Sequence, residues 1–212
     1  MEIRVNPTRM ELNRLKKRLA MAARGHKLLK DKRDELMRQF LILVRKNKEL
    51  REEVEGRLAR SFQKFMLARA VMSAEAVEEA IMFPQVQLEV KMETQNIMSV
   101  HCPKLTWQQV GEASASIYPY GFAETSGELD DSINTLSELL PRLLELAEVE
   151  KAVNLLADEI ERTRRRVNAL EYVMIPELQK TVRYITMKLD ENERANLTRL
   201  MKVKDIVRAK GV

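Results

Sequence analysis

The sequence predicts an all-α-dominated fold, a long antiparallel two-helix coiled coil with a small β-hairpin-containing insert. The first observation is composition, because 33% of the 212 residues are charged, 5% are aromatic and only 6 are glycine. This composition is typical of long helices and coiled coils. The second is a pair of long stretches whose apolar residues recur every 3.5 positions. The third is a stretch between them whose apolar residues alternate with polar ones, which is the period of a strand.

The same composition excludes several classes of protein. With 6 Gly and 6 Pro, the chain has too few turn formers for an all-β sandwich or for the glycine loops of a nucleotide-binding α/β domain. The single cysteine, Cys102, cannot form an internal disulfide, which fits a reducing compartment. The N-terminus has no apolar signal region, and no apolar run approaches the roughly 18 residues that span a bilayer. We expect a cytoplasmic protein that reaches the membrane surface only by docking on other proteins.

Residues 1–83 form the first predicted helix of the coil. No proline lies between Pro7 and Pro84, and Thr8 is a plausible N-cap. We expect a helix of about 65 residues, roughly 100 Å long at 1.5 Å per residue. His26 occupies a seam position and is expected to be a partly buried polar residue that sets the register. The apolar seam consists of Leu12, Leu15, Leu19, Ala22, Leu29, Leu36, Phe40, Leu43, Leu50, Val54 and Leu58.

Residues 84–127 form the predicted insert. It begins with four apolar residues at alternate positions, and a second apolar run follows at residues 97–100. We therefore expect a β-hairpin whose turn lies near residues 94–96. An isolated hairpin is marginally stable in water, so it should pack on the coiled coil or on a partner. The insert also holds the only tryptophan and a cluster of aromatic residues, which form either a small core under the hairpin or a docking site.

Residues 128–212 form the second predicted helix, which starts near Glu128. Pro141 and Pro176 lie inside it, and each should kink or divide the helix because proline lacks an amide donor. Two helices with one apolar strip each bury those strips by folding back on one another. The seam consists of Leu129, Ile133, Leu136, Leu139, Leu143, Leu146, Val149, Val153, Leu156, Ile160, Thr163, Val167, Leu170, Met174, Leu178, Val182, Ile185, Leu189, Leu200, Val203 and Val207.

The net charge of +5 is unevenly distributed. Residues 1–33 hold 11 Lys/Arg against 3 Asp/Glu, and residues 162–212 hold 13 against 6. Residues 129–161 hold 2 Lys/Arg against 9 Asp/Glu. An antiparallel arrangement is expected to bring the two basic ends together at one tip and to leave an acidic middle.

Two segments resemble the D subunit of V-type and archaeal-type rotary ATPases. The family's N-terminal signature is similar to residues 7–36, PTRMELNRLKKRLAMAARGHKLLKDKRDEL. Its C-terminal signature is similar to residues 162–194, RTRRRVNALEYVMIPELQKTVRYITMKLDENER. Within the second segment, RRRVNALE followed by IPEL and then by LDENER is the most specific part. The two segments cover roughly a third of the chain and occur in the expected order.

The resemblance implies a function. The D subunit is the central shaft of the rotary machine, and it couples ATP hydrolysis or synthesis to the movement of protons or sodium ions across a membrane. Its two termini enter a catalytic hexamer of A and B subunits, and its other half meets the small F subunit and the coupling subunit of the membrane ring. The shaft has no active site, no cofactor and no metal, it does not span the membrane, and it does not bind nucleic acid.

We assign candidate contacts on this basis. A basic tip could bind acidic loops of the catalytic head, although a run of charges can equally be a solvated helix face. The apolar and aromatic residues of the insert are candidates for the F subunit or the coupling subunit. The candidates for the head are Arg9, Lys16, Lys17, Arg24, Lys27, Arg162, Arg164, Arg165, Arg166, Lys202 and Lys204. The candidates for the F subunit or the coupling subunit are Val86, Leu88, Val90, Met92, Trp107, Tyr118, Tyr120 and Phe122, and Pro176 is the candidate helix kink.

Two other functions remain open from the sequence. A basic coiled-coil end could bind nucleic acid, although no aromatic residues interleave the basic ones. A tethering protein or a chaperone of the prefoldin kind is the other alternative, which higher self-association would favour. An ATP-hydrolysing enzyme is excluded by the lack of a G-x-x-x-x-G-K-[ST] phosphate loop.

Overall fold

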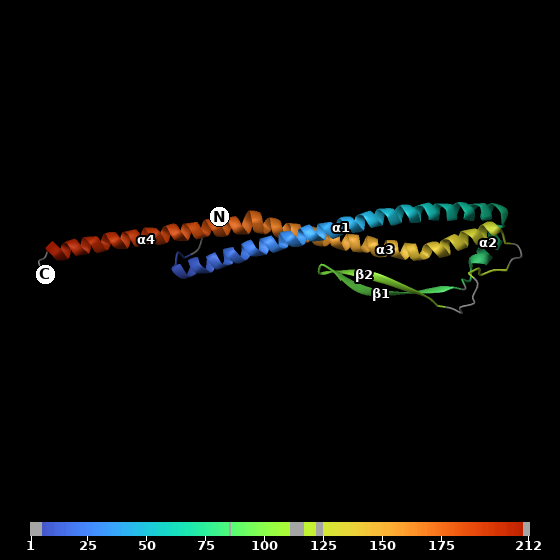
Figure 1. Cartoon of the computed structure of the whole chain (residues 1–212), viewed down its shortest axis with the longest axis horizontal. Coiled ribbons are helices and arrows are strands. Elements are labelled where there is room, and N and C mark those ends of the chain that lie inside the picture. The colour runs from blue at the N-terminus through green and yellow to red at the C-terminus, as the bar shows by residue number, and fades with distance from the viewer. Residues whose placement is uncertain (1–5, 85, 111–116, 122–124, 210–212) are drawn as a thin grey trace. The chain divides into compact units, whose positions relative to one another are not determined.

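The structure, a computed structural model, describes residues 6–84, 86–110, 117–121 and 125–209, and it confirms the predicted fold class (Figure 1). Two compact units divide the chain, and each is described by itself. Unit 1 contains residues 1–34 and 161–212, and unit 2 contains residues 35–160. The elements are α1 (Arg9–Val71), α2 (Ala74–Ile81), β1 (Gln87–Ile97), β2 (Val100–Val110), α3 (Gly127–Asn168), the π-helix η1 (Ala169–Met174) and α4 (Ile175–Ala209).

Helix α1 begins where the sequence predicts. The Oγ1 atom of Thr8 accepts a hydrogen bond from the amide of Glu11 at 3.2 Å, which satisfies one of the free donors of the first turn. The helix is 63 residues long, close to the predicted length. It ends at Val71, and a new cap follows at once, because the Oγ atom of Ser73 accepts from the amide of Ala76 at 3.2 Å to begin α2.

In unit 2 the predicted seams of α1 and α3 form the core. Leu36 and Leu156 are fully buried in one cluster, and Leu129 is fully buried with Ala68 in another. Between them lies a polar layer that the sequence did not predict, formed by Ser61 and Ser132. Each serine hydroxyl lies 3.1 Å from the backbone carbonyl oxygen of the other serine. Both are buried, and these contacts satisfy them.

Pro141 does not divide the second helix, which corrects one of the two alternatives predicted for it. Helix α3 continues through it from residue 127 to residue 168. The missing amide would have bonded the carbonyl of Ser137, four residues earlier. Ser137 is exposed, so that carbonyl remains accessible to water.

The predicted hairpin is present, but its turn lies elsewhere. Strands β1 and β2 are antiparallel with 11 residues each, and Ile97 pairs with Val100 across the turn. The turn residues are Met98 and Ser99, with φ of 53° and 72°. Two consecutive positive φ values are typical of the type I′ turn, which matches the twist of paired strands. The side chain of Asn96 stabilises it by accepting from the amide of Ser99 at 2.8 Å.

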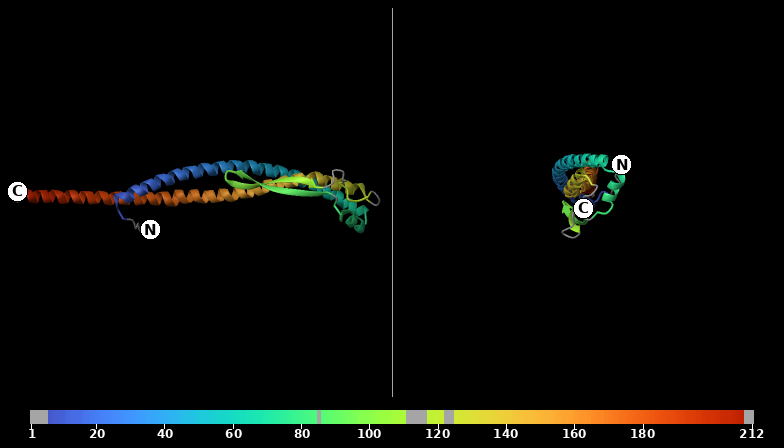
Figure 2. Two further views of the ribbon diagram at one scale, coloured as in Figure 1. Left: turned by 90° about the horizontal axis from the view of Figure 1, so that it is seen from below. Right: turned by 90° about the vertical axis from the view of Figure 1, so that its right-hand side faces the viewer.

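The hairpin packs along α3 of unit 2 (Figures 1 and 2). Near the turn, Val100 and Cys102 are buried in the cluster around Leu36 and Leu156. Near the open end, the opposite face of the ribbon is turned inward, because Leu88 and Trp107 line a cavity with residues of α3. A two-stranded ribbon twists strongly, so one face contacts the helix near the turn and the opposite face contacts it near the open end.

In unit 1, α1 pairs with α4 in antiparallel fashion. Leu15, Leu178 and Ile185 form the buried cluster, and the predicted seam residues Leu12, Leu19, Ala22, Val182 and Leu189 pack against it. Arg9, at the start of α1, forms an ion pair with Glu193. Beyond this point no other described helix packs on α4, since every residue from 190 to 209 is exposed. The predicted seam residues Leu200, Val203 and Val207 are therefore exposed rather than packed.

Pro176 does not end the helix either. It is the second residue of α4 and directly follows η1. The amide of Ile175 bonds the carbonyl of Leu170, five residues earlier, which is the pattern of a π-helix. This wider turn accommodates the proline, so the helix passes from α3 to α4 without a break in its helical path.

Candidate functional site

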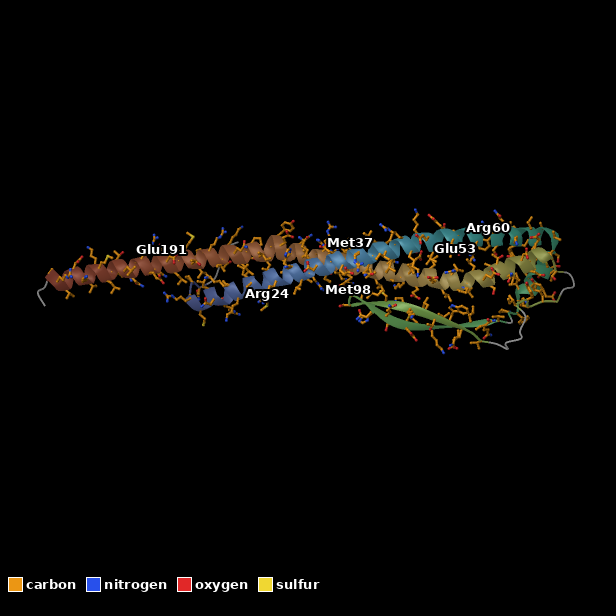
Figure 3. All side chains as sticks on the ribbon, viewed as in Figure 1. Arg24, Met37, Glu53, Arg60, Met98 and Glu191 are labelled. Atoms are coloured by element: carbon orange, nitrogen blue, oxygen red, sulfur yellow. The ribbon has the colours of Figure 1, made fainter. Side chains whose placement is uncertain are left out.

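The basic residues predicted to contact a catalytic head all lie in unit 1, and all eleven are exposed. Figure 3 shows the side chains along α1 and α4 in this unit, with Arg24 labelled. Two of the eleven form ion pairs, Arg9 with Glu193 and Arg165 with Glu161. Among the described residues, no ion pair is present for Lys16, Lys17, Arg24, Lys27, Arg162, Arg164, Arg166, Lys202 or Lys204. These positive charges are available to a partner.

The two basic ends of the chain do come together, since residues 1–34 and 161–212 form unit 1, but the candidate residues are spread along this unit. Arg162 lies near the end of α3, whereas Lys202 lies on the part of α4 that extends beyond α1. Forty helical residues separate them, or about 60 Å at 1.5 Å per residue. The basic surface follows the length of unit 1, because α4 continues about 24 Å past the residue that pairs with Arg9.

The predicted partner residues of the hairpin differ in exposure. Val86 and Leu88 are half-buried and line a cavity of about 90 Å³ with Leu140, Pro141 and Leu144 of α3. Three others remain available on the surface. The exposed fractions are 44% for Val90, 71% for Met92 and 43% for Trp107.

The predicted aromatic residues do not form one small core under the hairpin. Tyr118 and Tyr120 lie together, with ring centroids 6.2 Å apart and planes tilted by 48°. The hydroxyl of Tyr120 donates to the carboxylate of Asp130 at 2.6 Å, and burial together with this carboxylate raises the pKa of Tyr120. Tyr120 packs near Ala68, whereas Trp107 lines the separate cavity against α3. Phe122 lies outside the described residues.

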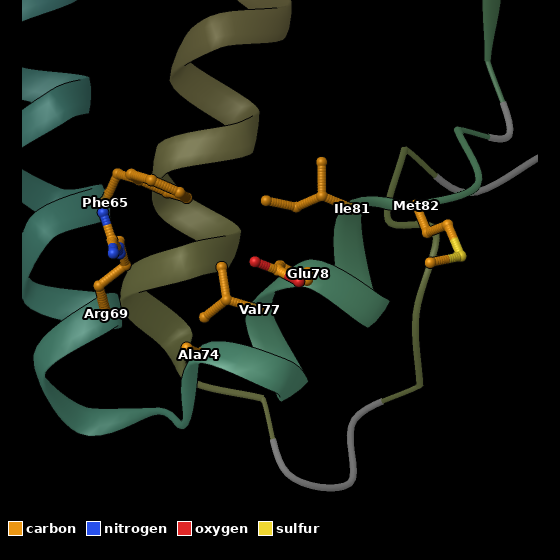
Figure 4. A pocket seen from close by; sticks show the side chains of 7 residues that line it. All are labelled: Phe65, Arg69, Ala74, Val77, Glu78, Ile81 and Met82. Carbon is orange, nitrogen blue, oxygen red and sulfur yellow. The ribbon is translucent and has the colours of Figure 1, made fainter.

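A further apolar surface, at α2, was not predicted. Phe65 and Arg69 of α1 face Val77 and Ile81 of α2 across a hollow of about 460 Å³ (Figure 4). Ile81 and Met82 line this hollow and are exposed, and four other large apolar side chains nearby in the sequence are exposed as well: Phe62, Met66, Val71 and Phe83. Exposed apolar surface of this kind is typical of interaction sites. We name it the α2 surface.

The sequence does contain a signal for the α2 surface. In residues 74–83, AEAVEEAIMF, Val77 and Ala80 alternate with acidic positions at helical spacing, and both are buried. The apolar residues Ile81, Met82 and Phe83 then follow in succession, so one short helix cannot bury them all. Their exposed fractions are 46%, 63% and 74%.

The part of the chain that the structure describes lacks two kinds of feature. It has no group of three or more His, Cys, Asp or Glu side chains placed to hold a metal ion. None of the helices there is both long and apolar enough to cross a bilayer. Cys102 is buried in the hairpin core, and burial raises the pKa of its thiol.

Comparison with known proteins covers nearly the whole chain. The family model for the D subunit of ATP synthase matches residues 11–205. The V-type ATP synthase D subunit of Acetivibrio thermocellus is 65% identical over 205 residues, which cover 97% of this chain and 92% of that protein. The proteins of the same name from Thermoanaerobacter pseudethanolicus and Clostridium botulinum (strain Alaska E43) are 60% and 58% identical, with at least 97% of every chain covered.

The match extends through both coil-forming segments, the α2 surface and the hairpin. The identity with each of these relatives is far above the level at which a shared fold and family are in question. The chain therefore belongs to the family of ATP synthase D subunits.

Proposed function

We propose that this chain is the central shaft of a V-type rotary ATPase or ATP synthase. It carries no catalytic group, and it transmits rotation between a hexameric head of A and B subunits and a membrane ring that moves protons or sodium ions. It works at the cytoplasmic face of the membrane as a peripheral part of the complex. The observation that carries the proposal is membership of the D-subunit family along nearly the whole chain.

The coil architecture suits the transmission of torque. In unit 2, three ion pairs join basic residues of α1 to acidic residues of α3 across the core seam, with N–O distances of 2.7 Å, 3.3 Å and 2.6 Å. Exposed ion pairs contribute little stability, but several along one interface favour a single register. A fixed register prevents one helix from sliding along the other when the coil is twisted. The pairs are Lys46–Glu145, Arg51–Glu150 and Lys64–Asp131.

Unit 1 is the proposed bearing in the catalytic head. Its exposed basic side chains would meet acidic loops of the A and B subunits, and the overhanging part of α4 would reach deepest. The exposed Leu197, Leu200 and Ile206 meet no other helix in the part of the chain that the structure describes, so head subunits would cover them. A partner with both apolar and acidic character would satisfy both features of this segment.

Unit 2 is the proposed contact with the rest of the rotor. The α2 surface suits the coupling subunit of the membrane ring, because its hollow could receive an apolar side chain of a partner. The exposed Val90, Met92 and Trp107 of the hairpin remain candidates for the F subunit.

Single-molecule rotation tests the proposal. The only native cysteine is buried, so a Cys102→Ser background with one new cysteine at the exposed position Glu89 allows a particle to be attached to the hairpin. The chain is assembled with A and B subunits that are fixed to a surface, and ATP is added. Stepwise rotation in one direction supports a shaft, since the head has three catalytic sites.

The controls separate assembly from function. A head that assembles with the chain and hydrolyses ATP while the attached particle stays still would overturn the proposal. Binding of the chain to DNA at low salt, with no affinity for the head subunits, would instead favour the nucleic-acid alternative. In the inverse experiment the chain is fixed to the surface and the particle is attached to one of the A subunits. The particle should then rotate in the opposite direction, because the head turns around the fixed shaft.

A further inference from the structure

The seam of the second helix changes phase at η1. Before η1 its packed residues are Thr163, Val167 and Leu170, at spacings of four and three. An unbroken heptad would continue at positions 174, 177 and 181. The apolar cluster instead contains Leu178 and Ile185 with Val182 and Leu189, one position later, and of the three unbroken heptad positions only Thr181 is buried beside them. Met174, which the unbroken heptad would bury, is 41% exposed.

The facing helix has no such change. In α1 of unit 1, Leu12, Leu15, Leu19 and Ala22 keep the spacing of three and four without interruption. His26 occupies the next position of the same heptad and is largely buried, with 21% of its side chain exposed. One helix therefore contains one residue more than its partner over the same length of coil.

The π-helix takes up this extra residue. A π-turn holds one residue more than an α-turn, because each amide bonds the carbonyl five residues back instead of four. The bond from Ile175 to Leu170 has this pattern. The surplus is displaced outward, since Tyr172 and Val173 are 72% and 62% exposed. Opposite them, the Nε2 atom of His26 lies 3.4 Å from a carboxylate oxygen of Glu171 and ties the turn to α1.

We propose that η1 is a register joint, a turn that stores one surplus residue and is the most easily opened part of the paired helices in unit 1. The heptad mismatch is its cause, and Pro176 is tolerated because the wide turn is there. In a shaft, such a joint would be the place where the helix yields first under torsion. This last point rests on the proposed function, but the joint itself is a property of the chain alone.

Hydrogen exchange of the full-length chain, followed by mass spectrometry, tests the joint. Amides of residues 170–175 should exchange about tenfold faster than those of residues 180–187, where the packed α-helix is regular. Deletion of Tyr172 together with Pro176→Ala leaves seam residues Thr163, Val167, Leu170, Ile175, Leu178, Val182, Ile185 and Leu189 in one unbroken heptad. In this variant we expect the difference in exchange to disappear and the melting temperature to rise.

Two further variants make the test decisive. Pro176→Ala alone keeps the surplus residue, so fast exchange should persist. Insertion of one alanine after Tyr172 adds a second surplus residue, and it should accelerate exchange and lower the melting temperature. Loss of fast exchange in Pro176→Ala alone would overturn the proposal, because the proline would then be the cause. Faster exchange or earlier melting of the deletion variant would overturn it as well. None of these results depends on whether the chain rotates in a complex.

Discussion

Leu156 and Ile185 are equally buried, with no exposed surface, but they lie in different units. Leu156 packs with Leu36 and with the hairpin residue Val100 in unit 2. Ile185 packs with Leu15 and Leu178 in unit 1. Replacing each with alanine is therefore a matched pair of changes, and each should destabilise its own unit.

The expected loss follows from the volume removed. A buried Leu or Ile replaced by alanine costs about 2–5 kcal/mol, because apolar contacts are lost and the cavity collapses only in part. With an m-value of about 2 kcal/mol/M in urea, a loss of about 3 kcal/mol lowers the midpoint by about 1.5 M. Leu41→Ala is the control, since Leu41 is 49% exposed, and it should change stability by less than about 0.5 kcal/mol.

The chain offers a probe for each unit. Trp107 is its only tryptophan and lies in the hairpin of unit 2, so urea unfolding followed by fluorescence reports unit 2. Far-ultraviolet circular dichroism reports the helices of both units. We expect Leu156→Ala to shift the fluorescence midpoint, and Ile185→Ala to shift only part of the dichroism curve. If Ile185→Ala moved the fluorescence midpoint as far as Leu156→Ala does, the two units would unfold as one and the reasoning would be wrong.

Three other outcomes are expected. The hydrogen bonds from Lys46 and Arg142 hold the pKa of Glu145 below its usual value, so the stability that this carboxylate contributes is present above pH about 4.5 and is lost as the pH falls through the lowered pKa. When urea midpoints are measured from pH 7 to pH 3, Glu145→Gln should therefore reduce the loss of stability at acidic pH. Ser99→Gly should raise the stability of the hairpin by up to about 1 kcal/mol, because glycine relieves about 1–2 kcal/mol of left-handed backbone strain and loses part of this gain to its greater unfolded-state entropy. The urea midpoint in Trp107 fluorescence measures the change, and a lower midpoint would contradict the turn assignment. Replacing Arg162, Arg164 and Arg166 with glutamine should reduce ATPase activity coupled to ion transport in the assembled complex, and unchanged activity and assembly would refute their contact with the head.

The coil was predictable because its signal is local. The seam residues repeat at a spacing that only a helix places on one face, and Thr8 has the side chain that caps a first turn. The hairpin turn was not predictable in the same way. Its residues, Met98 and Ser99, are not those that usually adopt positive φ, and the turn is held by Asn96, whose amide group had itself suggested a turn two residues too early.

The overhang of α4 and the joint at η1 were not predictable from the sequence of the second helix alone. Both depend on the length and the heptad phase of the helix that faces it. Leu200, Val203 and Val207 continue the apolar spacing of the helix, so periodicity alone assigns them to the seam. Their exposure follows from the position of α1, which begins at Arg9, because no other described residue packs on this part of α4. Likewise, a change of phase is meaningful only against the phase of the partner helix.

The candidate site shows a similar division. Exposure of the basic residues was predictable, since lysine and arginine are rarely buried. Their distribution along unit 1 was not, because it follows from where α4 passes the start of α1. The α2 surface was missed because eight helical residues produce only a short amphipathic pattern. Its significance comes from the hollow that α2 forms with Phe65 and Arg69 of α1, which lie close to it only after folding.

The charge distribution has a different meaning once the ion pairs are known. The acidic segment at residues 129–161 suggests by itself a surface for basic partners. Yet Asp131, Glu145 and Glu150 from this segment each contact a basic residue of α1. Three of the nine acidic residues of this segment are therefore paired within the molecule, where they order α1 against α3. The charges left for a partner are mainly the positive ones of unit 1, so long-range attraction should select partners with acidic surfaces for that unit and leave unit 2 to apolar recognition.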